Sequence, residues 1–251
     1  MELGKEERLD EIGFKGLKLI QTQSHFCYGT DAVLLSHFVK STTSHKGKFL
    51  VELGSGNGAV LLLLWKMTGA KEIFGVEVQR ELWEVATRNI VLNGAEKQIR
   101  IDEGDVSSYF KDNPKAWSGK ADIVVLNPPY VARGGGIPIK NSNRHIARHE
   151  TTATLKDFIE AASFILKDKG ELVMVHRPKR LVEIVTAMTG KGIEPRTIRF
   201  VHPKENEEPN IILVHGIKGA GRELKVLKPL YVYDNEGLSQ EVLRIYGKDK
   251  A

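Results

Sequence analysis

The 251-residue sequence is poor in cysteine and has no long hydrophobic run, and each shortage excludes a class of protein. The single cysteine, Cys27, excludes an internal disulfide and a zinc site built from several thiolates, so we expect no metal centre. No apolar run approaches the roughly 20 residues of a membrane-spanning helix, and the charged residues 1–8 do not resemble a secretory signal. We therefore predict a cytoplasmic protein that does not enter the membrane.

The composition is that of a folded chain. Hydrophobic residues make up 41% of the sequence, which is enough for a sizeable core and excludes wholesale disorder. The net charge of +5 permits a polyanionic partner without requiring one. The length suits one large domain or one domain with appendages. We expect an N-terminal extension over residues 1–45, a main domain over 46–220 and a packed tail over 221–251, and a monomer is the simplest oligomeric state.

Strand-like and helix-like segments alternate along the main domain, which predicts an α/β fold. Predicted strands cover residues 48–53, 72–77, 99–101, 121–126, 171–176, 196–201 and 210–214, and the last two are close enough to pair antiparallel. Predicted helices cover residues 59–67, 81–93, 155–166 and 179–189. We expect a mostly parallel seven-stranded sheet with an antiparallel C-terminal hairpin and helices on both faces. Outside it, residues 17–20 read as an added edge strand, and residues 224–233 as a strand laid against the body.

A glycine-rich turn follows the first strand of the main domain, where Gly54, Gly56 and Gly58 precede a helix. Glycines at a strand-to-helix turn let a ligand approach the backbone closely. Dehydrogenases share the arrangement but space their glycines as G-x-G-x-x-G, which this turn does not. Glu52, inside the preceding strand, suits a ligand with an ammonium group, and Glu77, about 20 residues on, suits a ribose diol.

The tetrapeptide Asn127-Pro128-Pro129-Tyr130 follows an apolar strand and predicts the reacting centre. An amine on a planar ring is a poor nucleophile because its lone pair is delocalised. The Asn127 side-chain oxygen and the Pro128 carbonyl can accept hydrogen bonds from such an amine, while consecutive prolines restrict the backbone that aims them. Tyr130 offers a face on which a flat substrate can stack. The alternative is an ordinary strand-to-loop turn.

The loop over residues 131–150 is rich in glycine and in basic residues and has no acid before Glu150. We interpret its basic side chains as phosphate contacts, against the alternative of a solvated surface loop. The candidate nucleic-acid contacts are Arg133, Lys140, Arg144, Arg148 and His149.

Two further segments have open interpretations. Asp105, at the end of the third strand, either accepts from an adenine amino group or caps the next turn. Thr30 or Asp31 can cap the helix that follows, and this structural role is favoured by the residues alone.

Taken together, these motifs resemble those of the class I S-adenosylmethionine-dependent methyltransferases of the methyltransferase small domain type, which have a Rossmann-like fold. More narrowly, the chain resembles the family that methylates N6 of adenine 37 in valine tRNA. The segments that carry this resemblance are residues 28–35, 54–58, 127–130, 147–150, 175–178, 201–204 and 229–233.

The resemblance implies a role for each segment and a tRNA substrate. The cofactor's methionyl end would be closed over by Tyr28, Gly29, Thr30 and Asp31. Its methionine part would be held by Glu52, Gly54, Gly56 and Gly58. Glu77 would contact the ribose and Val78 the adenine, which Asp105 and Val106 would also border. Asn127, which would also contact the cofactor, and Pro128 would orient the target amine beside the transferred methyl group. Pro129 lies between them and Tyr130, which would stack the flipped base.

Related motifs also serve enzymes that methylate protein glutamine, DNA adenine or ribosomal RNA. An N-methyltransferase of another substrate class is therefore the first alternative. A nicotinamide-dependent oxidoreductase and a non-catalytic RNA-binding module are alternatives from other classes.

Overall fold

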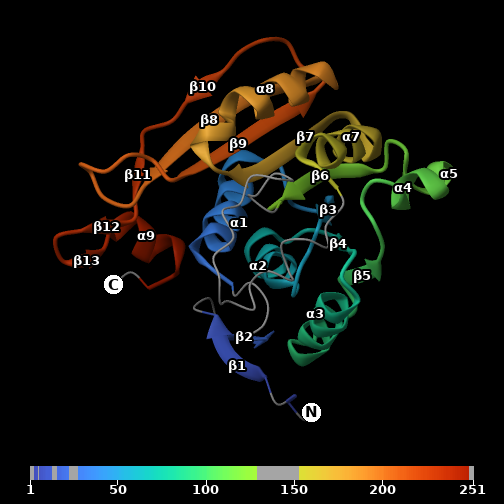
Figure 1. Cartoon of the computed structure of the whole chain (residues 1–251), viewed down its shortest axis with the longest axis horizontal. Helices are drawn as coiled ribbons and strands as arrows, with labels where there is room; N and C mark the ends of the chain where they lie inside the picture. The colour runs from blue at the N-terminus through green and yellow to red at the C-terminus, as the bar shows by residue number, and fades with distance from the viewer. Residues whose placement is uncertain (1–2, 5, 13–15, 23–27, 129–152, 249–251) are drawn as a thin grey trace, which may run out of the picture.

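One large β-sheet forms the centre of the computed structural model, which describes residues 3–4, 6–12, 16–22, 28–128 and 153–248 (Figure 1). From one edge to the other, its strands are β10 (Lys225–Val226), β8 (Ile193–His202), β9 (Ile211–Lys218), β7 (Leu166–His176), β6 (Ala121–Leu126), β3 (Phe49–Leu53), β4 (Glu72–Glu77) and β5 (Ile99–Glu103), and β11 (Leu230–Tyr231) also pairs with β8.

The pairing directions match the predicted sheet. Strands β7, β6, β3, β4 and β5 are parallel neighbours, whereas β9 runs antiparallel to both β7 and β8. The seven strands from β3 to β9 each have five or more residues and form the expected mostly parallel sheet with an antiparallel hairpin. The predicted tail strand is present as β10 and β11, two residues each, which lie parallel to β8.

Helices cover both faces of the sheet, as expected. The helices α1 (Thr30–Thr42), α2 (Ala59–Thr68) and α3 (Arg80–Leu92) pack on one face, and α4 (Tyr109–Asp112), α7 (Leu155–Ile165) and α8 (Leu181–Gly190) pack on the other (Figure 1). Within β3, Leu50 belongs to the first core and Val51 to the second, because successive strand residues point to opposite faces. The short elements α5 (Pro114–Trp117) and η2 (Pro178–Arg180) lie in connections.

The strand predicted at residues 17–20 is present, but the interpretation of it as an edge strand added to the central sheet is wrong. They lie in β2 (Leu17–Thr22), which pairs with β1 (Glu7–Ile12) in a separate two-stranded sheet. Alternating hydrophobicity indicated a strand but does not identify its partner. The other edge of β2 faces α3, whose side chains occupy its backbone hydrogen-bonding groups.

The helix cap expected at Thr30 or Asp31 is also wrong. Helix α1 begins at Thr30, its N-cap is Gly29, and the cap has no side-chain hydrogen bond. Gly29 is in extended geometry, which suits an N-cap position. The Thr30 and Asp31 side chains are therefore left for contacts other than capping.

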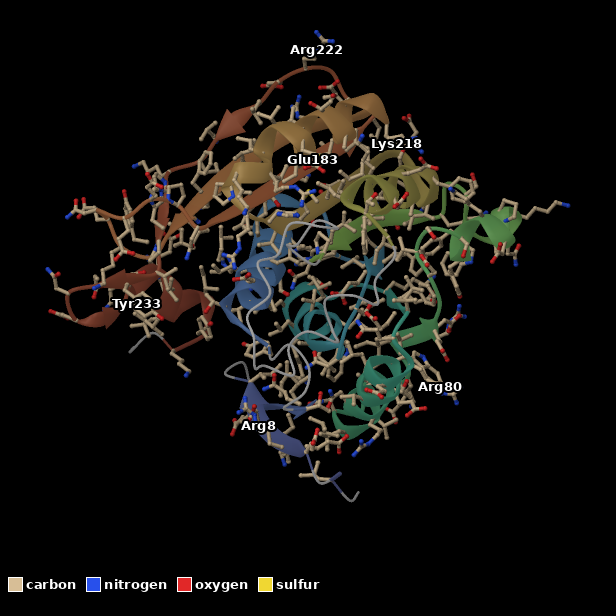
Figure 2. All side chains as sticks on the ribbon, in the orientation of Figure 1. Arg8, Arg80, Glu183, Lys218, Arg222 and Tyr233 are labelled. Carbon is tan, nitrogen blue, oxygen red and sulfur yellow. The ribbon has the colours of Figure 1, made fainter. Side chains whose placement is uncertain are left out.

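The tail continues past β11 into the hairpin of β12 (Tyr233–Asp234) and β13 (Gly237–Leu238) and then α9 (Gln240–Ile245). Val242 and Ile245 of α9 join the same core as α1 and α2. In the described part of the chain, no helix has the length and apolar character needed to cross a bilayer. Charged side chains such as Arg8, Arg80 and Arg222 point outward (Figure 2). The division at residues 45 and 220 stays a prediction.

Candidate active site at the carboxyl ends of β3, β4 and β6

The register of three neighbouring strands brings the sequence motifs to one edge of the sheet. Leu53 of β3 is paired with Val76 of β4 and with Leu126 of β6. The next residues along each strand are Gly54, Glu77 and Asn127, so the glycine turn lies between the acidic and the amide side chains. In parallel α/β sheets, ligands bind in the crevice at this end of the strands.

The glycine turn is held in place from behind and is open in front. The backbone N–H groups of Gly54 and Ser55 donate to the Val76 carbonyl at 2.9 and 3.0 Å. Gly56 has a φ of +54°, and a Cβ built on it meets no atom within 4 Å. Gly58 has a φ of +81°, and a Cβ there would lie 3.2 Å from the Ala86 Cβ. Gly58 is thus needed for packing, whereas Gly56 borders space in which a ligand can lie.

Glu77 stabilises the turn through its carboxylate. Its Oε2 accepts from the Gly56 N–H at 2.8 Å, and its Oε1 accepts from the Gln79 N–H at 2.9 Å. The side chain is only 4% exposed, and this burial raises its pKa, while the backbone donors act in the opposite direction. Val78, next to it, is half-buried. A ribose contact by Glu77 stays a prediction.

Glu52 is the electrostatically unbalanced group of the site. It is 1% exposed, and its Oε2 is buried without a hydrogen-bond partner among the described residues. Burial raises the pKa of the Glu52 carboxyl well above its usual range; a hydrogen bond with Ser55 opposes this rise, and the charge of Glu77 adds to it. An unpartnered buried carboxylate is costly unless a cation or donor reaches it. This observation fits the predicted ammonium-bearing ligand.

The reacting tetrapeptide is described in part. Asn127 is half-buried and Pro128 is buried, directly after β6. Pro129 and Tyr130 lie outside the described residues. So do the predicted phosphate contacts, which are Arg133, Lys140, Arg144, Arg148 and His149. Their roles stay predictions.

The Tyr28–Asp31 segment is fixed at two points. The Tyr28 N–H donates to the Gln21 Oε1 of β2 at 2.6 Å. The Thr30 side chain interacts with the phenol of Tyr246, which follows α9. Burial raises the pKa of Tyr28, whose ring packs against the core beside Tyr246. The segment therefore bridges the N-terminal hairpin and the C-terminal tail.

Asp105 has a structural role in its turn. Its Oδ1 accepts from the Ser107 N–H at 2.8 Å, and its backbone carbonyl accepts from Ser108 and Tyr109 at 3.1 and 2.8 Å. The N-cap of α4 is Ser108, so Asp105 stabilises the turn before the helix without capping the helix itself. Val106 is buried beside it. Contacts of Asp105 and Val106 with an adenine stay predictions.

The sequence motifs did not point to Asn89 of α3, which donates from its Nδ2 to the carbonyl of Asn57 in the glycine turn at 3.0 Å. The apolar positions of this helix include Leu82, Val85, Ala86 and Ile90, and Asn89 falls on the same face. A polar residue on a core-facing stripe is the signal that could have identified it.

The described residues hold no group of three or more His, Cys, Asp or Glu side chains suited to a metal ion. A pocket of about 570 Å³ does occur at the opposite, amino ends of the strands, where Lys71, Lys120 and Trp117 are among its lining residues. It lies away from the glycine turn and takes no part in the candidate site.

Comparison with known proteins gives concordant matches. Residues 14–189 match the family model of the methyltransferase small domain. A protein of Tolumonas auensis named tRNA1(Val) (adenine(37)-N6)-methyltransferase is 24% identical over 202 residues, covering 80% of each chain. A Porphyromonas gingivalis protein of the same name is 26% identical over 206 residues, covering 81% of this chain and 79% of the relative.

Solved structures share the fold. A predicted O-methyltransferase from Agrobacterium tumefaciens has a TM-score of 0.69 at 23% identity, over 87% of this chain and 96% of the other. TYW2 of M. jannaschii, determined in complex with AdoMet, has a TM-score of 0.58 at 15% identity, over 86% of this chain and 87% of the other. The predicted Rossmann-like class I architecture is therefore confirmed.

Proposed function

Because the chain belongs to the methyltransferase small domain family, we propose that it transfers a methyl group from S-adenosylmethionine to the N6 amine of an adenine in tRNA. Adenine 37 of valine tRNA is the expected target, as the names of the similar proteins suggest. The observation that carries the proposal is the unpartnered buried carboxylate of Glu52 beside an open glycine turn, at the strand edge that also carries Asn127. We place this activity in the cytoplasm, in a monomer.

The residues at the turn fit S-adenosylmethionine. The Glu52 carboxylate would accept a hydrogen bond from the ammonium group of the cofactor, which would give Oε2 the partner that it lacks among the described residues. The backbone of Gly54, Gly56 and Gly58 would hold the methionine part, which would lie in the open space beside Gly56. Glu77 and Val78 would face the ribose and adenine, with Asp105 and Val106 on the far side of the ring. When bound, the cofactor supplies an electrophilic methyl group on a sulfonium.

The protein's contribution to the chemistry is alignment of the amine. The Asn127 side-chain oxygen and the Pro128 carbonyl would accept the two N–H bonds of the adenine amine, which directs its lone pair toward the methyl group. Pro128 is buried two residues after the end of β6. The amine becomes acidic after attack and then loses its proton, so no strong general base is required.

The partner of this site is tRNA. The chain carries a net charge of +5, which suits a polyanion. The basic residues between 131 and 150 follow Asn127 in the sequence, and we propose them as phosphate contacts, with Tyr130 stacking the flipped base. The family match counts against a nicotinamide-dependent oxidoreductase, and the glycine spacing agrees with that.

Mass spectrometry of nucleosides tests the proposal. Purified protein and S-adenosylmethionine are incubated with separate pools of tRNA, ribosomal RNA, DNA and protein. We expect N6-methyladenosine to appear in the tRNA pool with wild-type protein and to be absent with Asn127→Ala, although that variant still binds S-adenosylhomocysteine. Transfer to glutamine in the protein pool alone would refute the tRNA substrate and leave the cofactor assignment standing.

A further inference from the structure

Asn89 of α3 and Asn93, the C-cap residue that follows this helix, lie one helical turn apart and hydrogen-bond to the backbone of β2. The Asn89 Oδ1 accepts from the Ile20 N–H at 2.7 Å, and its Nδ2 donates to the Ile20 carbonyl at 3.1 Å. The Asn93 side chain repeats this pattern at Lys18, with distances of 3.0 and 2.7 Å. Both amide groups thus pair with the backbone of alternate β2 residues, as a neighbouring strand would.

The two asparagines differ in what else they touch. Asn89 is 0% exposed, and its Nδ2 also donates to the Asn57 carbonyl of the glycine turn at 3.0 Å. Asn93 is half-buried, and its second Nδ2 bond returns to the Asn89 carbonyl of its own helix at 2.8 Å. Both side chains therefore hold β2, and Asn89 is the one that also reaches the turn.

Strand β2 leads from Asn89 to the other side of the candidate cofactor site. Gln21, the residue after Ile20, is 3% exposed and accepts from the Tyr28 N–H at 2.6 Å. Its Nε2 donates to Asp10 of β1, which fixes the orientation of the amide. Hydrogen bonds and the chain of β2 therefore join the glycine turn to Tyr28 through Asn89, Ile20 and Gln21; the bonds at Ile20 are buried, and those at Asn57 and Tyr28 are partly buried.

We propose that Asn89 is a positioning residue, which couples the geometry of the glycine turn to that of the Tyr28–Asp31 segment. The inference rests on the proposed function, because the two elements are joined in this way if both contact S-adenosylmethionine. The Asn57 carbonyl accepts a hydrogen bond from the Asn89 side chain, and that side chain is in turn held by its hydrogen bonds to Ile20 of β2. Displacing β2 therefore loosens the turn, and a ligand that orders the turn also orders β2.

Two matched substitutions distinguish a role of Asn89 in positioning the glycine turn from a role only in attaching the β1–β2 hairpin to α3. Asn89→Ala removes the bonds to β2 and to the turn, whereas Asn93→Ala removes the equivalent bonds to β2 and one to the Asn89 carbonyl, but none to the turn. At a temperature where both variants are folded, we expect Asn89→Ala to weaken binding of S-adenosylhomocysteine about tenfold, since the loss of one hydrogen bond changes an equilibrium by this order. The KM for tRNA stays unchanged. Asn93→Ala binds within about twofold of wild type. Equal effects of the two variants, or none, would overturn the inference.

Hydrogen exchange on the wild-type protein gives a second readout that requires no substitution. Adding S-adenosylhomocysteine should slow exchange of the Ile20 and Tyr28 amides, which lie on the proposed hydrogen-bond path, as well as amides of the turn. Slower exchange in the turn alone would overturn the inference while the proposed function survives. Absence of any binding to wild-type protein would refute the proposed function itself, and the inference with it.

Discussion

Replacement of Glu52 by glutamine is expected to weaken cofactor binding. It is also expected to remove a pH-dependent destabilisation of the ligand-free protein. Glutamine has the same shape, but it carries no charge to attract an ammonium group. A hydrogen bond to a charged group contributes about 1.5–3 kcal/mol. The Kd of S-adenosylhomocysteine should therefore rise about 10- to 150-fold in Glu52→Gln. Isothermal titration at pH 7.5 measures this directly.

The free energy of unfolding of the ligand-free wild-type protein should fall as pH rises. Burial raises the pKa of the folded-state Glu52 above the ordinary value of 4.5. Between those two pKa values the folded state holds more protons than the unfolded state, so the free energy of unfolding falls as pH increases. A tenfold difference in proton affinity between the two states corresponds to about 1.4 kcal/mol. Glu52→Gln lacks this contribution, so its Tm relative to wild type should increase from pH 5 to pH 8.

The control is Glu72→Gln, an exposed residue at the start of β4 in the same sheet. It removes one charge from the same protein without touching the glycine turn, so its affinity for S-adenosylhomocysteine should match wild type. Wild-type affinity should also increase as pH rises through the raised pKa of Glu52, and this dependence should weaken in Glu52→Gln. Unaltered affinity in Glu52→Gln would show that the carboxylate does not hold the ligand's ammonium group, and the reasoning would fail.

Three further predictions address the remaining parts of the site. Asn127→Ala should lower kcat by about 10²-fold or more, comparable to removal of a preorganised transition-state hydrogen bond, while the Kd of S-adenosylhomocysteine stays within about twofold in titrations. Gly75→Ala should destabilise the protein by about 1–3 kcal/mol in urea unfolding, because the added Cβ would lie 2.5 Å from the Ser55 Oγ. Thr30→Val and Tyr246→Phe should each raise the KM for S-adenosylmethionine with little change in kcat, and the double variant should be no worse than either single one; additive effects would mean that the two side chains act separately.

Much of the fold followed from local patterns, because the signals of a parallel α/β domain are themselves local. Apolar runs of strand length alternate with amphipathic helices, and glycines mark where strand β3 turns into α2. The antiparallel hairpin was predictable from the short connection between β8 and β9. The placement of Glu77 and Asn127 beside the glycine turn then required only the rule that ligand sites lie at the carboxyl ends of parallel strands.

The details that were missed depend on contacts between distant segments. The alternation at residues 17–20 indicated a strand, but its pairing with β1 and with the side chains of α3 was not encoded in that pattern. The cap of α1 was assigned to Thr30 or Asp31 by composition, whereas the chain begins the helix one residue earlier than such a cap would require. Asn89 lies 32 residues from Asn57, and their hydrogen bond exists because α3 packs against the turn.

The two buried acids, Glu77 and Glu52, differ in their hydrogen bonds, and this difference makes Glu52 the better candidate for a charged contact with a ligand. Glu77 already accepts two backbone hydrogen bonds, so its carboxylate is stabilised within the protein and holds the turn. Glu52 lies deeper, and its Oε2 has no partner among the described residues. A buried carboxylate without a partner destabilises the folded protein unless a bound cation or hydrogen-bond donor offsets the effect. A cationic ligand at the glycine turn would lower the pKa of Glu52 and stabilise its charged form, so binding at a pH below the raised pKa would release a proton and would strengthen as pH rises.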